Sequence, residues 1–409
     1  MTAVYDAAVI GAGPAGAALA IHLARAGQRV IVLEAKRLPR DKACAESISP
    51  AAEPLLRDLS VFDDDVLASA RLRGFRVYAP NGRSFQGDYA GTRDSAGHSC
   101  YENGLVIRRS RLDAALIGGA EKAGVVIQDG WRLSRLTQET SGDATTTTLF
   151  PTDTGQAPLK ARLLLAADGV HSTVARQFDL RRPGKLRKIA LVAHMRGIAG
   201  LTEYGEMHVA GRRYVGVAPL ETAGDLCNVA MVVDEKRDGR AVAGQAESFL
   251  SAALQSFPGL RGRLDNAYIE RRTLTTSGIC TKVRRLSGDG FLLVGDAAGY
   301  YDPFTGEGIY RALRGAQLAA AVALPALAGH DNSARALAAY DRDYRREFRG
   351  KRFVEMIIQV GVAVPPLMNH LAATMEKRKD MADTIVAVTG DILPPWAALN
   401  PAYLLRLAV

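Results

Sequence analysis

The chain of 409 residues has few cysteines, and they form no recognisable functional pattern. They are scattered, with no C-x-x-C pair and no cluster with histidine, at Cys44, Cys100, Cys227 and Cys280. This scatter argues against a zinc site and against a disulfide scaffold. We therefore expect no bound metal and a reducing, cytoplasmic environment.

Long hydrophobic runs are also missing. The most apolar later stretches, Leu318–Ala328 and Ile357–Met368, contain proline and are too short to span a membrane. The N-terminal residues enter a strand pattern at once, which leaves no room for a signal peptide. These features predict a cytoplasmic protein without membrane-spanning segments.

Nucleic-acid-binding motifs are absent although the chain is basic, with 52 Lys and Arg against 43 Asp and Glu and a formal charge of +9. The basic residues cluster at Arg181–Lys188 and Arg345–Arg352. A solvated basic surface is the simplest interpretation of these clusters. Attraction of an anionic nicotinamide cofactor or of a peripheral membrane surface is the alternative, whereas we expect no nucleic-acid partner.

The first 34 residues contain the most specific motif of the chain. The apolar run Val4–Ile10 predicts a buried strand, and residues 11–16 follow it directly with the G-x-G-x-x-G pattern G-A-G-P-A-G. A second strand, Val30–Leu33, ends on Glu34, at the distance expected for an acid that binds a ribose hydroxyl. The glycines permit a tight turn and a close approach to a pyrophosphate, and the following helix N-terminus attracts its charge.

Other apolar strands also end in pairs of acid and glycine. Leu163–Ala167 precedes Asp168-Gly169, and Phe291–Val294 precedes Gly295-Asp296. Open α/β sheets bind ligands at the carboxyl ends of their strands, so we expect these pairs to share a site with the first turn.

Short alternating runs between these segments predict a second sheet. A hairpin is expected over Leu72–Tyr89, and antiparallel strands are expected over Ile189–Asp234. The chain reads as helical from about Ser333 until Pro394-Pro395 ends this part before a short tail, Ala397–Val409.

In this order the motifs resemble the flavoprotein superfamily of para-hydroxybenzoate hydroxylase, and within it the geranylgeranyl reductase-like branch. The motifs that carry the resemblance over residues 4–330 are G-A-G-P-A-G at 11–16, P-R-D-K-A-C-A-E-S-I-S-P at 39–50, R-x-x-L-D at 109–113, A-D-G-V-H-S at 167–172 and G-D-A-A-G-Y-Y-D-P-F-T-G-E-G-I at 295–309. The resemblance implies one tightly held FAD that NADH or NADPH reduces.

The implied fold class is α/β with an α+β insertion. A discontinuous, Rossmann-like FAD-binding domain would take residues 1–70, 100–178 and 271–330. An inserted antiparallel β-sheet domain for the substrate would take 71–99 and 179–270, and a C-terminal helical segment would take 331–409.

The resemblance also implies the residues that contact FAD. The glycine turn would hold the pyrophosphate and Glu34 the adenosine ribose, while Arg109 and Asp296 would lie near the phosphates and the ribityl chain. Residues 305–308 would start a helix that faces the flavin pyrimidine, which becomes anionic on reduction. The expected cofactor-binding residues are Gly11, Gly13, Pro14, Ala15, Gly16, Glu34, Ala35, Cys44, Ala45, Arg109, Asp168, Gly169, Gly295, Asp296, Pro303, Gly306, Glu307, Gly308 and Ile309.

The segment Lys42–Glu46 matches the family's K-x-C-G-E loop beside the isoalloxazine, except that Ala45 replaces the glycine. Alanine disfavours any backbone with positive φ at that position. Cys44 either lines the flavin or is a small buried residue.

Flavin halogenases share much of this pattern but need a lysine between their channel and the substrate. No lysine occurs between Lys42 and Lys122, and the two tryptophans, Trp131 and Trp396, cannot form a W-x-W motif. We therefore expect no halogenation.

The substrate is expected between the flavin and the inserted sheet. The candidate lining residues are Tyr204, Tyr214, Pro219 and Phe304. His194 and His208 fall on predicted strands of that sheet, where they either position a substrate group or serve a structural role.

The leading functional interpretation is an NAD(P)H-consuming, FAD-dependent monooxygenase that acts on a hydrophobic aromatic or polyketide-like compound. A reductase that saturates isoprenoid double bonds is the alternative, and an electron-transfer flavoprotein without a small substrate is the third. Only one complete G-x-G-x-x-G occurs, so NADPH or NADH is expected to bind transiently near Asp168-Gly169. No residue pattern assigns a catalytic side chain.

Overall fold

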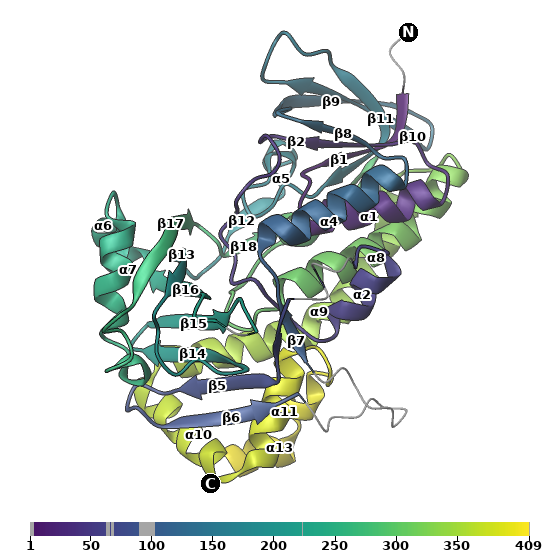
Figure 1. Ribbon diagram of the computed structural model, residues 1–409. Helices are drawn as coiled ribbons and strands as arrows, with labels where there is room; N and C mark the ends of the chain where they lie inside the picture. Colours follow the sequence, from purple (N-terminus) through teal and green to yellow (C-terminus); the bar gives the residue numbers. More distant parts are fainter. Residues whose placement is uncertain (1–3, 63–65, 67–68, 90–102, 223, 409) are drawn as a thin grey trace.

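The computed structural model describes residues 4–62, 66, 69–89, 103–222 and 224–408, so Cys100 lies outside the described residues. Figure 1 shows a sheet at each end of the molecule, with long helices running between them. The first strand and the last helix lie at opposite ends of this arrangement.

The first sheet has a parallel core in the order β20-β11-β1-β2-β8. These strands are β1 (Val4–Ile10), β2 (Val30–Glu34), β8 (Val126–Asp129), β11 (Leu159–Ala166) and β20 (Phe291–Leu293). Antiparallel strands extend it: β9 (Leu133–Ser141), β10 (Ala144–Pro151) and β19 (Ser287–Gly288). The apolar runs that predicted β1 and β2 are buried in its centre.

Helices cover this parallel core. Helix α1 (Pro14–Arg25) packs against α4 (Arg109–Lys122) and α8 (Gly308–Ala328), while α2 (Ala52–Asp58) packs against α8. Leu19 and Leu23, one turn apart on α1, are fully buried, as their spacing predicts. The other elements of this part are α5 (Thr173–Gln177) and the short 3₁₀ helix η2 (Gly295–Ala298).

The second sheet has the order β17-β13-β16-β15-β14-β5-β6. Its strands are β5 (Gly74–Tyr78), β6 (Ser84–Asp88), β13 (Lys188–Arg196), β14 (Tyr204–Ala210), β15 (Arg213–Pro219), β16 (Cys227–Asp234) and β17 (Tyr268–Ser277). The predicted hairpin is β5–β6, and the predicted antiparallel pairing holds for every neighbour except β14 and β5, which are parallel. A parallel pair needs a long connection, which the chain between β5 and β14 provides. The boundary that we placed after residue 270 falls inside β17, which stays paired with β13 to Ser277.

Smaller pieces join the two sheets. A three-stranded sheet has the order β3-β7-β4, formed by β3 (Ser47–Ile48), β4 (Ala70–Leu72) and β7 (Gly104–Val106). An antiparallel pair is formed by β12 (Arg181–Pro183) and β18 (Thr281–Val283).

Helices cover both faces of the second sheet. One face packs against α6 (Glu235–Val242), α7 (Ala246–Leu254) and the 3₁₀ helix η1 (Pro258–Leu260). The other face packs against C-terminal helices, among them α9 (Ala334–Ala363), α10 (Pro365–Lys377) and α11 (Lys379–Thr389). The helical character predicted from Ser333 is therefore confirmed. The predicted tail is also helical to Ala408, as α12 (Trp396–Leu399) and α13 (Pro401–Ala408).

Within the described ranges no single helix is long and apolar enough to cross a membrane. Helices α9 and α10 pass such a test only when taken together, and they are bent by 111° at the break between them.

Candidate functional site

The strand order brings the predicted motifs together at one edge of the first sheet. Strands β20, β11, β1 and β2 are neighbours and run in parallel, so their carboxyl ends meet. Gly295-Asp296, Asp168-Gly169, the glycine turn and Glu34 follow or end these strands. This edge is where open α/β sheets bind ligands.

Each glycine of the first turn meets a different packing demand. Gly11 has a φ of +103°, and a Cβ there would lie 2.5 Å from the Ala167 carbonyl oxygen. A Cβ on Gly16 would lie 2.0 Å from the Gly11 carbonyl oxygen, so helix and turn pack at backbone contact. A Cβ on Gly13 would have only the Arg40 guanidinium nearby, at 3.8 Å. Gly13 therefore faces open space.

That open space is a groove, which we call the glycine groove. The expected cofactor residues that line it are Gly13, Pro14, Ala15, Cys44, Ala45, Arg109, Gly169, Gly295, Asp296, Pro303, Gly306, Gly308 and Ile309. Those that do not line it are Gly11, Gly16, Glu34, Ala35, Asp168 and Glu307. The N-termini of α1 and α8 both reach the groove, so unpaired backbone N–H groups and partial positive charge converge there.

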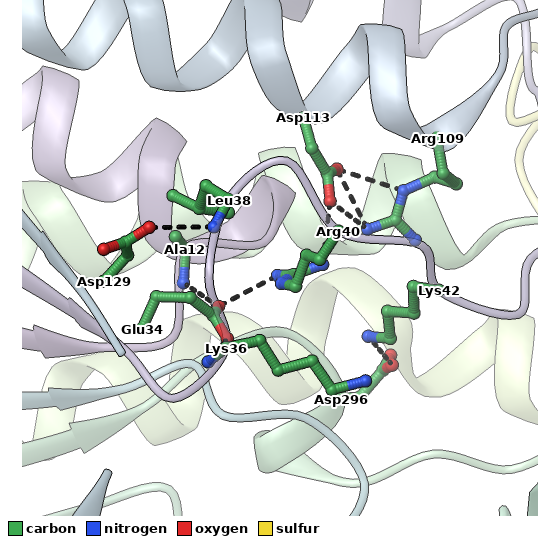
Figure 2. Close-up of polar contacts among 10 residues, drawn as sticks. All are labelled: Ala12, Glu34, Lys36, Leu38, Arg40, Lys42, Arg109, Asp113, Asp129 and Asp296. Carbon is green, nitrogen blue, oxygen red and sulfur yellow. Dashed lines mark hydrogen bonds and ion pairs between the residues drawn. The ribbon is translucent and has the colours of Figure 1, made fainter. Parts of the chain in front are cut away.

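Glu34 lies behind the groove in a network of charged side chains, which Figure 2 shows. Its carboxylate accepts the Ala12 N–H at 3.0 Å and the Lys36 N–H at 3.1 Å, and it pairs with Arg40 at 3.0 Å. Burial alone would raise the pKa of Glu34, but Arg40 and these backbone donors outweigh it and lower the pKa. The carboxylate therefore carries its charge beside Arg40 and fixes the backbone of the glycine turn through the Ala12 N–H.

The network continues from Arg40 through Asp113 to Arg109. Arg40 pairs with Asp113 at 3.1 Å, and Arg109 pairs with the same carboxylate at 3.0 Å. Burial opposes the charge of Arg109, but Asp113 overcomes this and raises its pKa. Sequence reasoning missed Arg40, although it lies inside the motif at residues 39–50, because nothing in that motif shows which acids it would meet.

The cations on the groove match a pyrophosphate. Lys36, Lys42 and Arg109 line it. Lys42 pairs with Asp296, which also lines the groove, at 3.8 Å. Cations and helix N-termini at one place fit a dinucleotide cofactor such as FAD.

Two of the expected acids turn away from the groove. Asp168 accepts the Thr173 N–H at 2.7 Å and so holds the start of α5, while Gly169, with a φ of +78°, lines the groove in its place. Burial raises the pKa of Asp168. Glu307 lies at the start of α8 beside Arg311, and burial raises its pKa to about 8.

Glu46 anchors the loop Lys42–Glu46. Its carboxylate accepts the Arg109 N–H at 2.8 Å and lies 2.8 Å from His194 Nε2 and 3.0 Å from Asn228 Nδ2. Sequence reasoning placed the question of positive φ at Ala45, but among the described residues of this loop the positive φ belongs to Glu46, at +61°. Alanine at position 45 is therefore compatible with the loop.

A second hollow, which we call the apolar cavity, lies between the second sheet and the C-terminal helices. Its walls include Phe75, Val77 and Phe85 of β5 and β6, Met207 and Val217 of β14 and β15, and Ile358, Met368, Leu371, Met375, Val386 and Leu407 of the C-terminal helices. Ala45, Ser47, Pro303 and Gly306 line both the apolar cavity and the glycine groove. The two spaces therefore meet at these residues.

Of the residues expected to contact the substrate, Phe304 lies in the wall of the apolar cavity. The others do not line it: His194, Tyr204, His208, Tyr214 and Pro219. Tyr214 points its hydroxyl at Asp302, at 2.6 Å, and burial lowers the pKa of His208, which pairs with Glu206 at 2.9 Å. Alternation along a strand identifies its two faces but does not show which face meets a cavity.

The fold and the glycine groove define a flavin-dependent oxidoreductase. The chain belongs to the FAD binding domain family, which matches residues 4–355, and so to the para-hydroxybenzoate hydroxylase type of flavoprotein. FAD is the cofactor that this family binds, and the groove residues above fit it.

Sequence similarity to relatives covers nearly the whole chain. Digeranylgeranylglycerophospholipid reductase 2 of Methanopyrus kandleri is 26% identical over 397 residues, which cover 95% of this chain and 93% of that protein. Conditioned medium factor receptor 1 of Dictyostelium discoideum is 28% identical over 415 residues, covering 96% of this chain and 78% of that protein.

Solved structures share the fold. A flavoprotein/dehydrogenase from Cytophaga hutchinsonii superposes with a TM-score of 0.81 at 20% identity, covering 98% of this chain and 95% of that one. The flavin-dependent brominase Bmp2 gives a TM-score of 0.79 at 18% identity and full coverage of both chains. At these identities the similarity shows the fold alone.

Proposed function

We propose that this flavoprotein reduces carbon–carbon double bonds in a long, apolar, isoprenoid-like substrate. The observation that carries the proposal is the meeting of the apolar cavity with the glycine groove at Ala45, Ser47, Pro303 and Gly306. A chain held in the cavity would present one end to the flavin. Relatives from Methanopyrus kandleri and Methanococcus aeolicus are named digeranylgeranylglycerophospholipid reductases, which favours this reaction over the hydroxylation that the sequence first suggested.

The residues of the glycine groove would hold FAD, which when bound supplies hydride transfer. Gly13 and the start of α1 would take the pyrophosphate, with Arg109 and Lys42 balancing its charge. Glu34 would accept a ribose hydroxyl, and the start of α8 would favour negative charge on the flavin pyrimidine.

The apolar cavity would select its substrate by size and hydrophobicity. Among its polar wall groups, Glu206 is held by Arg263 and His208, and the Tyr403 hydroxyl donates to the Met381 carbonyl. These two groups are already paired, whereas the buried hydroxyl of Thr305, which also lines the cavity, has no hydrogen-bond partner among the described residues. The rest of the wall is mainly apolar. Such a space also excludes water from the flavin end.

The electron donor would be a nicotinamide cofactor. NADPH or NADH would bind transiently at the open side of the groove near Gly169, because the chain has no second G-x-G-x-x-G for it. Hydroxylation by O₂ remains the second candidate, since a water-excluding cavity beside a flavin suits that reaction as well.

The test supplies FAD-loaded protein and NADPH with a geranylgeranyl lipid, under nitrogen and in air, and measures product mass. We expect a product that has gained hydrogen under nitrogen. A product that has gained an oxygen atom, formed only in air, would instead support the hydroxylase. Reduction of the flavin without change of any lipid would leave the electron-transfer interpretation.

Variants at Gly216 show whether the apolar cavity holds the substrate. A Cβ at this position in β15 would have no atom closer than 3.6 Å, so alanine fits there in ordinary van der Waals contact. A longer side chain would reach into the cavity that Gly216 lines. Gly216→Leu should slow turnover at least about tenfold while FAD stays bound, since a branched side chain takes the space of part of the substrate. Gly216→Ala, the matched control, should keep most of the activity.

A further inference from the structure

Helix α9 carries one exposed stripe along its outer face. Residues spaced three or four apart lie on one side of a helix, and those on this stripe are Arg342, Arg346, Arg349, Phe353, Met356 and Val360. The exposed Val364 follows the last residue of the helix. Phe353 is 53% exposed and Val360 51% exposed. The stripe is basic in its first half and apolar in its second, and the change falls between Arg349 and Phe353.

Neighbouring helices widen the apolar half. Leu367 of α10 continues the stripe past the bend, while Trp396 of α12 and Leu405 of α13 are 71% and 68% exposed. Helix α12 packs on α9, and α13 packs on α10. In Figure 1, α9 runs from the first sheet toward the second, and α10 and α13 lie at the end of the molecule away from the first sheet. We call the apolar half of the stripe with these three residues the apolar face.

Basic side chains outnumber acidic ones on this part of α9, where Asp341, Asp343 and Glu347 lie among the arginines. Arg342 and Arg345 lie 3.8 and 3.3 Å from acids of their own helix. Arg346 and Arg349 are exposed and form no ion pair within the described parts of the chain. A helix that combines exposed apolar residues with free arginines on one side is complementary to a bilayer with anionic headgroups.

The apolar cavity reaches the surface at this face. Ile357 and Leu404 line the cavity and are also 38% and 39% exposed. The inner end of the same cavity is at Ala45 and Gly306, beside the glycine groove. The cavity therefore runs from the apolar face toward the flavin site.

We infer that the protein docks on an anionic lipid membrane through the apolar face and the arginine row of α9, and that its substrate enters the cavity directly from the bilayer. Phe353, Val360, Trp396 and Leu405 enter the interface, and Arg346 and Arg349 bind lipid phosphates. The entry of substrate rests on the proposed function, whereas the docking does not.

Co-sedimentation of the FAD-loaded chain with vesicles tests the docking. The vesicles are phosphatidylcholine alone or phosphatidylcholine with phosphatidylglycerol, and no substrate is present. Arg346→Gln with Arg349→Gln should weaken binding to the anionic vesicles about 30-fold, since each arginine near such a surface contributes about fivefold. Phe353→Asp with Val360→Asp should abolish binding to both kinds of vesicle.

Matched controls replace residues of the same types elsewhere. Val126 is 46% exposed on β8 of the first sheet, and Arg132 and Arg212 are exposed outside α9. Val126→Asp, and Arg132→Gln with Arg212→Gln, should bind as the wild type does. Docking through α9 is overturned if the wild type does not sediment with anionic vesicles, or if the controls lose as much binding as the α9 variants. It is also overturned if the apolar face instead joins two copies, seen as a dimer that Phe353→Asp with Val360→Asp dissociates.

Turnover of a geranylgeranyl lipid separates docking from function. The variant Phe353→Asp with Val360→Asp should keep turnover of detergent-dispersed lipid and lose turnover of the same lipid in vesicles. Equal loss in both would overturn entry from the bilayer. Vesicle binding without turnover in either form would leave the docking supported and count against the proposed function alone.

Discussion

At the scale of single residues, Glu46 is the side chain that connects the loop Lys42–Glu46 to the elements around it. It has a left-handed φ of +61°, which costs on the order of 1–3 kcal/mol for a residue other than glycine. Its carboxylate meets the N–H of Arg109 on α4 and side chains of β13 and β16. It therefore positions the loop that carries Cys44 and Ala45 between the first and second sheets.

Replacing Glu46 should affect both stability and cofactor retention. Glu46→Ala leaves buried polar partners unsatisfied, and we expect unfolding free energy to fall by about 2–4 kcal/mol. FAD should dissociate faster, because Cys44 and Ala45 line the groove. Urea unfolding and flavin fluorescence measure these effects. Glu121→Ala, at an exposed position of α4, is the control and should change stability by less than about 0.5 kcal/mol. Unchanged FAD release in Glu46→Ala would show that the loop holds its place without this anchor.

At the scale of elements, the turn from β1 into α1 depends on contact between backbones. The strand, the glycine turn and the helix could all be predicted from residues 4–34, because each follows from local pattern and turn chemistry. The local pattern could not show which distant residues each element contacts in the fold. Arg40, for example, meets Asp113, which lies far along the chain on α4.

Helix glycines of α1 and α4 should respond in opposite ways to the same substitution. A Cβ on Gly16 would lie 2.0 Å from the Gly11 carbonyl oxygen, so Gly16→Ala should lose about 1–3 kcal/mol of stability and most FAD binding. Gly118 of α4 has no atom within 4 Å of its Cβ position, so Gly118→Ala should gain about 0.5–1 kcal/mol with FAD binding unchanged. Thermal unfolding and FAD titration compare the pair. Equal effects would mean that close packing at the turn is not what holds the cofactor site.

At the scale of the whole molecule, the groove and the cavity differ in how far the sequence predicts them. Most of the groove follows from short motifs at strand ends, since parallel strands bring their carboxyl ends to one edge. The walls of the apolar cavity come from β5, β15 and helices near the C-terminus, such as Phe75, Val217 and Met375. Apolar spacing predicts that such elements bury a face, but it does not predict that their faces enclose a space together. The substrate residues chosen from strands alone therefore fell mainly outside the wall.

The most direct test of the account is a single turnover without nicotinamide. The FAD-loaded protein is reduced with dithionite under nitrogen and mixed with a geranylgeranyl lipid, and the absorbance of oxidised flavin is followed. The account predicts that the absorbance returns in proportion to the lipid added, and that Gly216→Leu slows the return while Gly216→Ala does not. A flavin that stays reduced at saturating lipid until air is admitted would contradict it.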